Sequence, residues 1–111
     1  DAVKYTVNKC LKPLLWYISS TNWTGPGPLF RLNKKQDREK EYAWLSEMGI
    51  AGIKVDFFSG DSVSTMNYYI DLLEDAIKYK LMLNFHGATI PRGWQRTYPH
   101  MMSIEGVYGA E

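Results

Sequence analysis

Three short apolar runs, each separated from the next by a stretch of helical periodicity, constrain the fold of this chain most strongly. The runs lie at residues 13–18, 52–58 and 81–86, and the sequences between them predict helices at residues 37–48 and 62–80. Strands that are apolar on both faces and alternate with helices are typical of a parallel sheet covered by helices. We also expect a helix near the N-terminus and a fourth strand within residues 103–108.

Two architectures fit this α/β pattern. A chain of 111 residues is long enough for a small doubly wound domain, or for three or four units of a (β/α)8 TIM barrel, which uses about 31 residues per unit. The chain opens on Asp1 without an initiator methionine and stops within an apolar segment, so we expect an excerpt truncated at both ends. This expectation and the long loops after the strands favour the barrel fragment. In both architectures chemistry takes place at the C-terminal ends of the strands.

Charge, hydropathy and cysteine content exclude several classes of partner and of site. The formal net charge is +1, which gives no general reason to expect nucleic acid or an anionic membrane surface. No apolar run approaches the roughly 20 residues needed to span a bilayer. The single cysteine, Cys10, excludes a disulfide within these residues and a site built from several thiolates.

Two charges share one face of the second predicted strand. Because strand side chains alternate, Lys54 and Asp56 point one way, while Ile53, Val55 and Phe57 point the other. A charge inside a sheet is costly unless it is fully hydrogen-bonded or has a role. We therefore predict a functional carboxylate at Asp56, with a merely stabilising ion pair as the alternative.

The next strand repeats this arrangement with Asn84 and His86 on one face. No second histidine or cysteine stands at metal-ligand spacing, so a zinc site is not expected. In the loop that follows, Arg92 and Trp94 offer hydrogen-bond donors and a flat apolar face, a mixture that suits a sugar. Trp16 is a further candidate for contacting the substrate or, alternatively, a core residue. A solvated loop without function is the alternative for residues 88–99.

Two glutamates near the end of the sequence, Glu105 and Glu111, flank the segment Gly-Val-Tyr-Gly-Ala. One or both are candidates to join Asp56 in a set of carboxylates. Glycoside hydrolysis requires such a pair, in which one carboxylate attacks or activates water and the other protonates the leaving oxygen. Taken alone, the two glutamates are a weak signal.

Four motifs together resemble glycoside hydrolase family 97. They are GIKVDF at residues 52–57, NFHGA at 84–88, PRGWQRTYP at 91–99 and EGVYGAE at 105–111. Members of this family are bacterial α-glucosidases and α-galactosidases with a (β/α)8 barrel and a bound calcium ion. The resemblance implies that residues 1–111 form one partial catalytic domain, comprising about strands 3 to 6 of the barrel with the intervening helices.

The resemblance also implies roles for single residues. Retaining members carry an aspartate nucleophile at the end of the strand that matches Asp56. Inverting members carry a glutamate base directly after the histidine of the Asn-x-His motif, and Gly87 stands at that position here. The general acid/base falls on Glu111, and both Glu105 and Glu111 are implied as calcium ligands. Because calcium takes six to eight oxygen ligands, most of them are expected outside these residues.

The expected function is therefore a retaining, calcium-dependent hydrolase of terminal α-galactosides or α-glucosides, acting on a glycoside or oligosaccharide. The resemblance further implies a periplasmic or secreted protein. Two alternatives remain. One is a truncated barrel fragment that is inactive alone and self-associates through its open sheet edges. The other is a non-catalytic piece that binds carbohydrate.

Overall fold

The computed structural model describes residues 2–18, 31–58 and 60–107. Its centre is a four-stranded sheet in the order β1–β2–β3–β4, and all three pairs of neighbouring strands are parallel. The strands are β1 (Leu14–Ile18), β2 (Gly52–Asp56), β3 (Met82–Phe85) and β4 (Met101–Ile104). The α/β class with a parallel sheet, predicted from the sequence, is confirmed.

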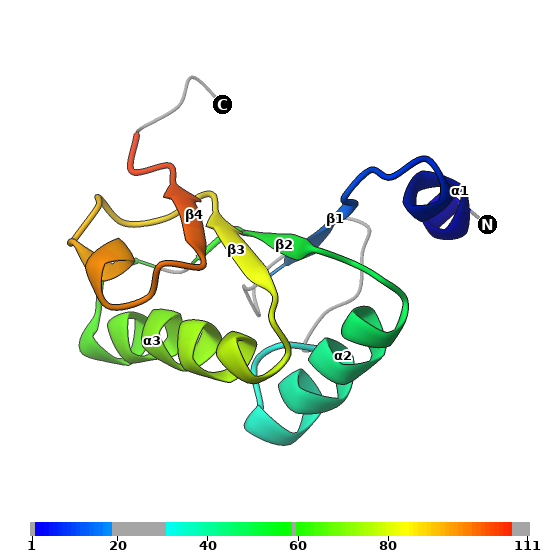
Figure 1. The fold of residues 1–111 in the computed structure, drawn as a ribbon. Helices are drawn as coiled ribbons and strands as arrows, with labels where there is room; N and C mark the ends of the chain where they lie inside the picture. Colours follow the sequence, from blue (N-terminus) through cyan, green and yellow to red (C-terminus); the bar gives the residue numbers. More distant parts are fainter. Residues whose placement is uncertain (1, 19–30, 59, 108–111) are drawn as a thin grey trace.

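Helices occupy the connections between the strands, and one further helix precedes β1. They are α1 (Ala2–Asn8), α2 (Lys35–Glu47), α3 (Val63–Lys78) and the short 3-10 helix η1 (Trp94–Arg96). Figure 1 shows α2 and α3 on the same side of the sheet, with α1 standing apart beyond β1. Within the described ranges, none of the helices combines the length and the apolar character that crossing a membrane requires.

The hydrophobic core lies between one face of the sheet and the helices α2 and α3. We call this the covered face, and it is formed by Ile53, Val55, Leu83 and Phe85, all of which are 0% exposed. The helices contribute fully buried side chains to the same cluster: Tyr42, Leu45, Tyr69, Leu72, Leu73 and Ala76.

The opposite face carries the alternate side chains of the same strands. We call it the open face, formed by Leu14, Trp16, Lys54, Asp56, Met82 and Asn84. Three of its apolar side chains are substantially exposed, Leu14 at 43%, Trp16 at 45% and Met82 at 39%, whereas Ile18, which is paired with Asp56, is 1% exposed. The alternation predicted for these strands is therefore confirmed over Gly52–Asp56 and Met82–Phe85, and it separates a packed face from one that the described residues cover only in part.

A buried ion pair ties the two covering helices together. Arg38 on α2 is 3% exposed, and its guanidinium lies 2.7 Å from the carboxylate of Asp75 on α3. The same guanidinium donates to the carbonyl oxygen of Leu32 at 2.9 Å. The orientation of α2 against α3 is thus fixed by a charge-assisted contact as well as by apolar packing.

One predicted side-chain direction is corrected by the structure. Phe57, expected on the same face as Ile53 and Val55, has a positive φ of 63°, a conformation that ends the alternation of the strand. Its ring lies edge-on to Trp16, with centroids 6.2 Å apart. Phe58 enters the core instead and stacks on Tyr69 at 4.0 Å.

Candidate active site

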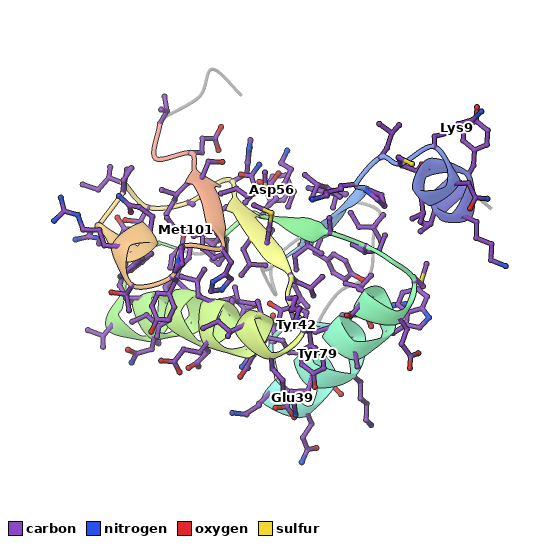
Figure 2. The ribbon with its side chains drawn as sticks, in the orientation of Figure 1. Lys9, Glu39, Tyr42, Asp56, Tyr79 and Met101 are labelled. Atoms are coloured by element: carbon purple, nitrogen blue, oxygen red, sulfur yellow. The ribbon has the colours of Figure 1, made fainter. Side chains whose placement is uncertain are left out.

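The candidate site lies on the open face, at the C-terminal ends of β2 and β3. Asp56 is the last residue of β2, and Figure 2 shows it on the side of the sheet away from Tyr42 and Tyr79. The parallel register pairs Trp16 of β1 with Lys54 of β2, and Lys54 in turn with Asn84 of β3. The side chains of Trp16, Lys54 and Asn84 are thereby aligned across the sheet, at the register position two residues before Asp56.

The Asp56 carboxylate is held by contacts to both of its oxygens. Oδ2 accepts a hydrogen bond from Nε1 of Trp16 at 3.2 Å and lies 3.4 Å from Nζ of Lys54. Oδ1 accepts from the backbone N–H of Phe57 at 2.9 Å. The side chain of Asp56 is 13% exposed, so the carboxylate is mostly enclosed but keeps some contact with solvent. These contacts fix its orientation at the end of the strand.

A second polar group lies at the ends of β3 and β4. Oδ1 of Asn84 accepts from the hydroxyl of Ser103 at 2.8 Å. Oε2 of Glu105 accepts from the backbone N–H of Gly87 at 2.7 Å and lies 3.6 Å from Nδ1 of His86. The predicted residues Asn84, His86 and Glu105 are thus gathered along two neighbouring strand ends.

The two groups meet at Gly87. This residue follows His86, and its Cα faces the Asp56 carboxylate so closely that an added Cβ would lie 3.1 Å from Oδ1. The carbonyl oxygen of Gly87 accepts from the N–H of Phe58 at 3.1 Å. The ends of β2 and β3 are therefore in direct contact, and Asp56 and Glu105 lie on either side of one glycine.

Arg92 and Trp94 contact residues other than those that hold the Asp56 carboxylate. Nη2 of Arg92 is 3.4 Å from the hydroxyl of Thr89, and the Trp94 ring packs against Tyr69 of α3 with centroids 5.1 Å apart. Tyr69 also accepts from the N–H of Thr89 at 3.0 Å, and burial raises the pKa of Tyr69 to about 12. Both predicted residues thus belong to the loop over α3, and their role in binding a substrate stays a prediction.

The remaining predictions concern the metal and the second carboxylate. Glu111 lies outside the described residues. In the part of the chain that the structure describes, no three His, Cys, Asp or Glu side chains gather where they could hold a metal ion. Glu105 fits calcium in chemical type, because its carboxylate is an oxygen ligand and its side chain is 30% exposed. It supplies one residue of a set that would have to be larger.

Sequence reasoning missed two partners of the predicted residues. Ser103 bonds Asn84 across β3 and β4, and its only signal in the sequence is its place in the last predicted strand. The N–H of Phe57 gave no signal, because side-chain identity does not reveal a backbone donor. Taken together, an oriented carboxylate at a strand end, with a cation and an indole N–H beside it, can act as a nucleophile or as a base.

Known proteins share both the sequence and the fold. A family model described as glycoside hydrolase 97 matches residues 1–107. A probable retaining alpha-galactosidase of Streptomyces bingchenggensis (strain BCW-1) is 41% identical over 80 residues, which is 72% of this chain and 13% of that protein. A retaining alpha-galactosidase of Bacteroides thetaiotaomicron is 37% identical over 106 residues, covering 91% of this chain and 15% of that protein.

Two solved structures superpose on most of the chain. A crystal structure of a beta-arabinopyranosidase has a TM-score of 0.83 and 46% sequence identity, with 88% of this chain and 16% of that chain covered. An R171K variant of a glycoside hydrolase family 97 enzyme from Pseudoalteromonas sp. strain K8 has a TM-score of 0.75 at 18% identity, with 95% and 17% covered. The chain spans about one seventh of the length of the curated relatives that it matches.

Proposed function

The chain belongs to glycoside hydrolase family 97, and we propose that its residues form part of the catalytic domain of a longer, retaining α-galactosidase. We call that longer protein the full-length enzyme. In this proposal the four parallel strands are about strands 3 to 6 of a (β/α)8 barrel, and the open face turns toward the barrel interior. By resemblance to the family, we also propose a periplasmic or secreted location.

The single observation that carries the proposal is the environment of Asp56. Its carboxylate stands at the C-terminal end of a parallel strand and is oriented by Trp16, Lys54 and the N–H of Phe57. Active sites of parallel α/β folds lie at this end of the strands. A nucleophilic carboxylate needs a fixed orientation toward the carbon that it attacks.

The proposed reaction has two steps. The Asp56 carboxylate attacks the anomeric carbon and forms a glycosyl ester, while Glu111 gives its proton to the departing glycosidic oxygen. Glu111 then removes a proton from water, which attacks the anomeric carbon and releases Asp56 as the carboxylate with net retention of configuration. Retention requires the two carboxyl groups to lie about 5–5.5 Å apart. Lys54, Asn84 and His86 are proposed to bind sugar hydroxyls.

A calcium ion forms part of the proposal. Glu105 would be one of its ligands, together with Glu111, and the remaining oxygens would come from parts of the full-length enzyme beyond this chain. When bound, the ion would supply positive charge close to the substrate oxygens. Glu105 already holds the N–H of Gly87 at 2.7 Å, so its own contribution here is to orient the end of β3.

Two classes of sugar are supported as substrates. The curated relatives carry the name alpha-galactosidase, whereas a structure at 46% identity is titled a beta-arabinopyranosidase. An α-D-galactopyranoside and a β-L-arabinopyranoside share the configuration of their ring hydroxyls and differ by a hydroxymethyl group. Comparing kcat/KM for the nitrophenyl α-galactoside, α-glucoside and β-L-arabinopyranoside separates these classes, and we expect the first to be preferred.

Replacing the nucleophile tests the mechanism. In the full-length enzyme, Asp56→Ala should lower kcat by about 10⁴-fold or more, and added azide should restore turnover with a β-glycosyl azide as product. Asp71→Ala removes a carboxylate on the exposed side of α3 and should leave kcat unchanged. Nuclear magnetic resonance of the first sugar released by the unmodified enzyme should show the α-anomer. An inverted product, or no rescue by azide, would contradict the assignment of Asp56.

A further inference from the structure

Gly87 occupies the point where the ends of β2 and β3 touch. Its φ is +52°, in the left-handed region that favours glycine. The N–H of the preceding residue, His86, donates to the carbonyl oxygen of Val55 at 2.8 Å, and the N–H of Phe58 donates to the carbonyl oxygen of Gly87 at 3.1 Å. The backbone at residue 87 is thus bonded on both sides to the chain that carries Asp56.

The backbone groups of Gly87 and its missing side chain face different partners. Its N–H bonds Glu105 and its carbonyl oxygen bonds Phe58. A Cβ at this position would lie 2.9 Å from the backbone N of Phe57 and 3.1 Å from Oδ1 of Asp56. Real Cβ atoms essentially never approach another heavy atom closer than 3.0 Å, so an alanine here would force a displacement.

The atoms that a side chain would displace are those that orient Asp56. The N–H of Phe57 donates to Oδ1 of Asp56 at 2.9 Å, and the two atoms of this bond are the ones that the added Cβ would meet. The Cα of Phe57 is also only 3.1 Å away. Because backbone atoms cannot swing aside as the end of a flexible side chain can, the carboxylate and its donor would have to move together.

We infer that Gly87 is a positioning residue for the Asp56 carboxylate, because the absence of its side chain leaves room for the hydrogen bond between Asp56 and the N–H of Phe57. This inference rests on the proposed role of Asp56 as nucleophile. Gly87 acts through Asp56 and does not itself take part in the chemistry. A displacement of about 1 Å in a reacting group can lower a rate by about 100-fold.

A matched pair of glycine substitutions in the full-length enzyme tests the inference. Gly87→Ala places a side chain against Asp56 in a left-handed backbone. Gly93→Ala has the same backbone disadvantage, at φ +80°, but its Cβ would meet nothing within 4 Å. We expect Gly87→Ala to lower kcat by about 100-fold with KM changed less than threefold, and Gly93→Ala to stay within twofold of the unmodified enzyme in both constants.

The folded fraction of each sample is measured by circular dichroism at the assay temperature, and each rate is divided by it. Loss of fold in Gly87→Ala is thereby separated from loss of rate in folded molecules. An unchanged kcat in Gly87→Ala would overturn the inference. An equal loss in Gly93→Ala would overturn it as well, since backbone strain alone would then account for the effect.

A second background distinguishes positioning from a general structural role. In Asp56→Ala the carboxylate is gone and azide attacks in its place, so adding Gly87→Ala should change the azide-dependent rate by less than about threefold. A 100-fold further loss in this background would overturn the inference while leaving the nucleophile assignment intact. If azide restores no turnover in Asp56→Ala alone, the proposed function fails, and the inference fails with it.

Discussion

The two faces of the sheet are built from the same strands, yet one forms the hydrophobic core and the other carries the residues of the candidate site. On the covered face, Ile53, Val55, Leu83 and Phe85 are completely buried under α2 and α3. On the open face, Leu14 and Trp16 of β1 and Met82 of β3 remain 39–45% exposed. Alternation along a strand therefore lets one short sequence specify a core and present chemistry at the same time.

Polar side chains also have different kinds of hydrogen-bond partner on the two sides of the sheet. Near the core, backbone carbonyl oxygens are among the partners: Arg38 bonds the carbonyl oxygen of Leu32 as well as Asp75, and the hydroxyl of Tyr42 bonds the carbonyl oxygen of Leu72. On the open face, the polar side chains bond one another, as Trp16 and Asp56 do. Among the described residues, no buried side-chain nitrogen or oxygen lacks a partner. The open face is thus organised before any substrate is present.

The sharpest test of this contrast compares neighbours on β3 that point in opposite directions. In the 111-residue chain, Phe85→Ala should lower the free energy of unfolding by about 3–5 kcal/mol, because it empties a core position between Phe58 and Tyr69. Met82→Ala, at a site 39% exposed, should cost less than about 1 kcal/mol. Urea unfolding followed by tryptophan fluorescence measures both. Equal losses would contradict the division into two faces.

The ion pair between the covering helices gives the next largest effect. Arg38→Ala leaves the Asp75 carboxylate, whose side chain is 11% exposed, without its closest cation, and should cost about 3 kcal/mol of unfolding free energy. Lys35 also approaches Asp75, at 3.5 Å, but its side chain is 69% exposed. Lys35→Ala should therefore cost at most about 1 kcal/mol. The same urea titrations measure this pair, and a larger loss in Lys35→Ala would reverse the argument.

Much of the fold could be predicted because it follows from periodicity. The alternation in β2 and β3 places Lys54 and Asp56 together on one side of the sheet, and the structure confirms this. The side-chain direction predicted for Phe57 was wrong because the positive φ of this residue ends the alternation. Residue type alone does not reveal such a conformation. The fourth strand begins at Met101 rather than within residues 103–108, since its position is set by pairing with β3 through an irregularity next to Leu83.

The candidate site could be predicted only one strand at a time. Trp16 and Asp56 are 40 residues apart, and their hydrogen bond depends on the register of β1 against β2. No local pattern contains that information, so Trp16 was predicted only as a possible wall of the pocket or as core. In the same way, the sequence displays a glycine at position 87, but only the packed chain reveals that it faces Asp56.

The exposed apolar side chains of the open face predict the behaviour of the 111-residue chain expressed alone. A second copy can cover Leu14 and Met82, so we expect light scattering to report assemblies above the monomer mass of 12.8 kDa. Leu14→Lys should weaken association about 30-fold, since burying a leucine stabilises by about 2 kcal/mol. Val63→Lys, at a 77% exposed site on α3, should not. A monomeric unmodified chain would show that the open face needs no cover.

The smallest expected effect concerns Trp16, whose indole N–H bonds the proposed nucleophile. Trp16→Phe keeps a flat apolar ring but removes the N–H that bonds Oδ2 of Asp56 at 3.2 Å. In the full-length enzyme, kcat should fall about tenfold, equivalent to about 1.4 kcal/mol, because one of the contacts to the carboxylate is lost. Trp44→Phe changes a tryptophan of similar exposure, 48% against 45%, on α2 and should leave kcat unchanged. If Trp16 serves instead as a platform for the sugar, the smaller area of the phenyl ring will raise KM while kcat holds. That result would move Trp16 from orienting Asp56 to binding the substrate.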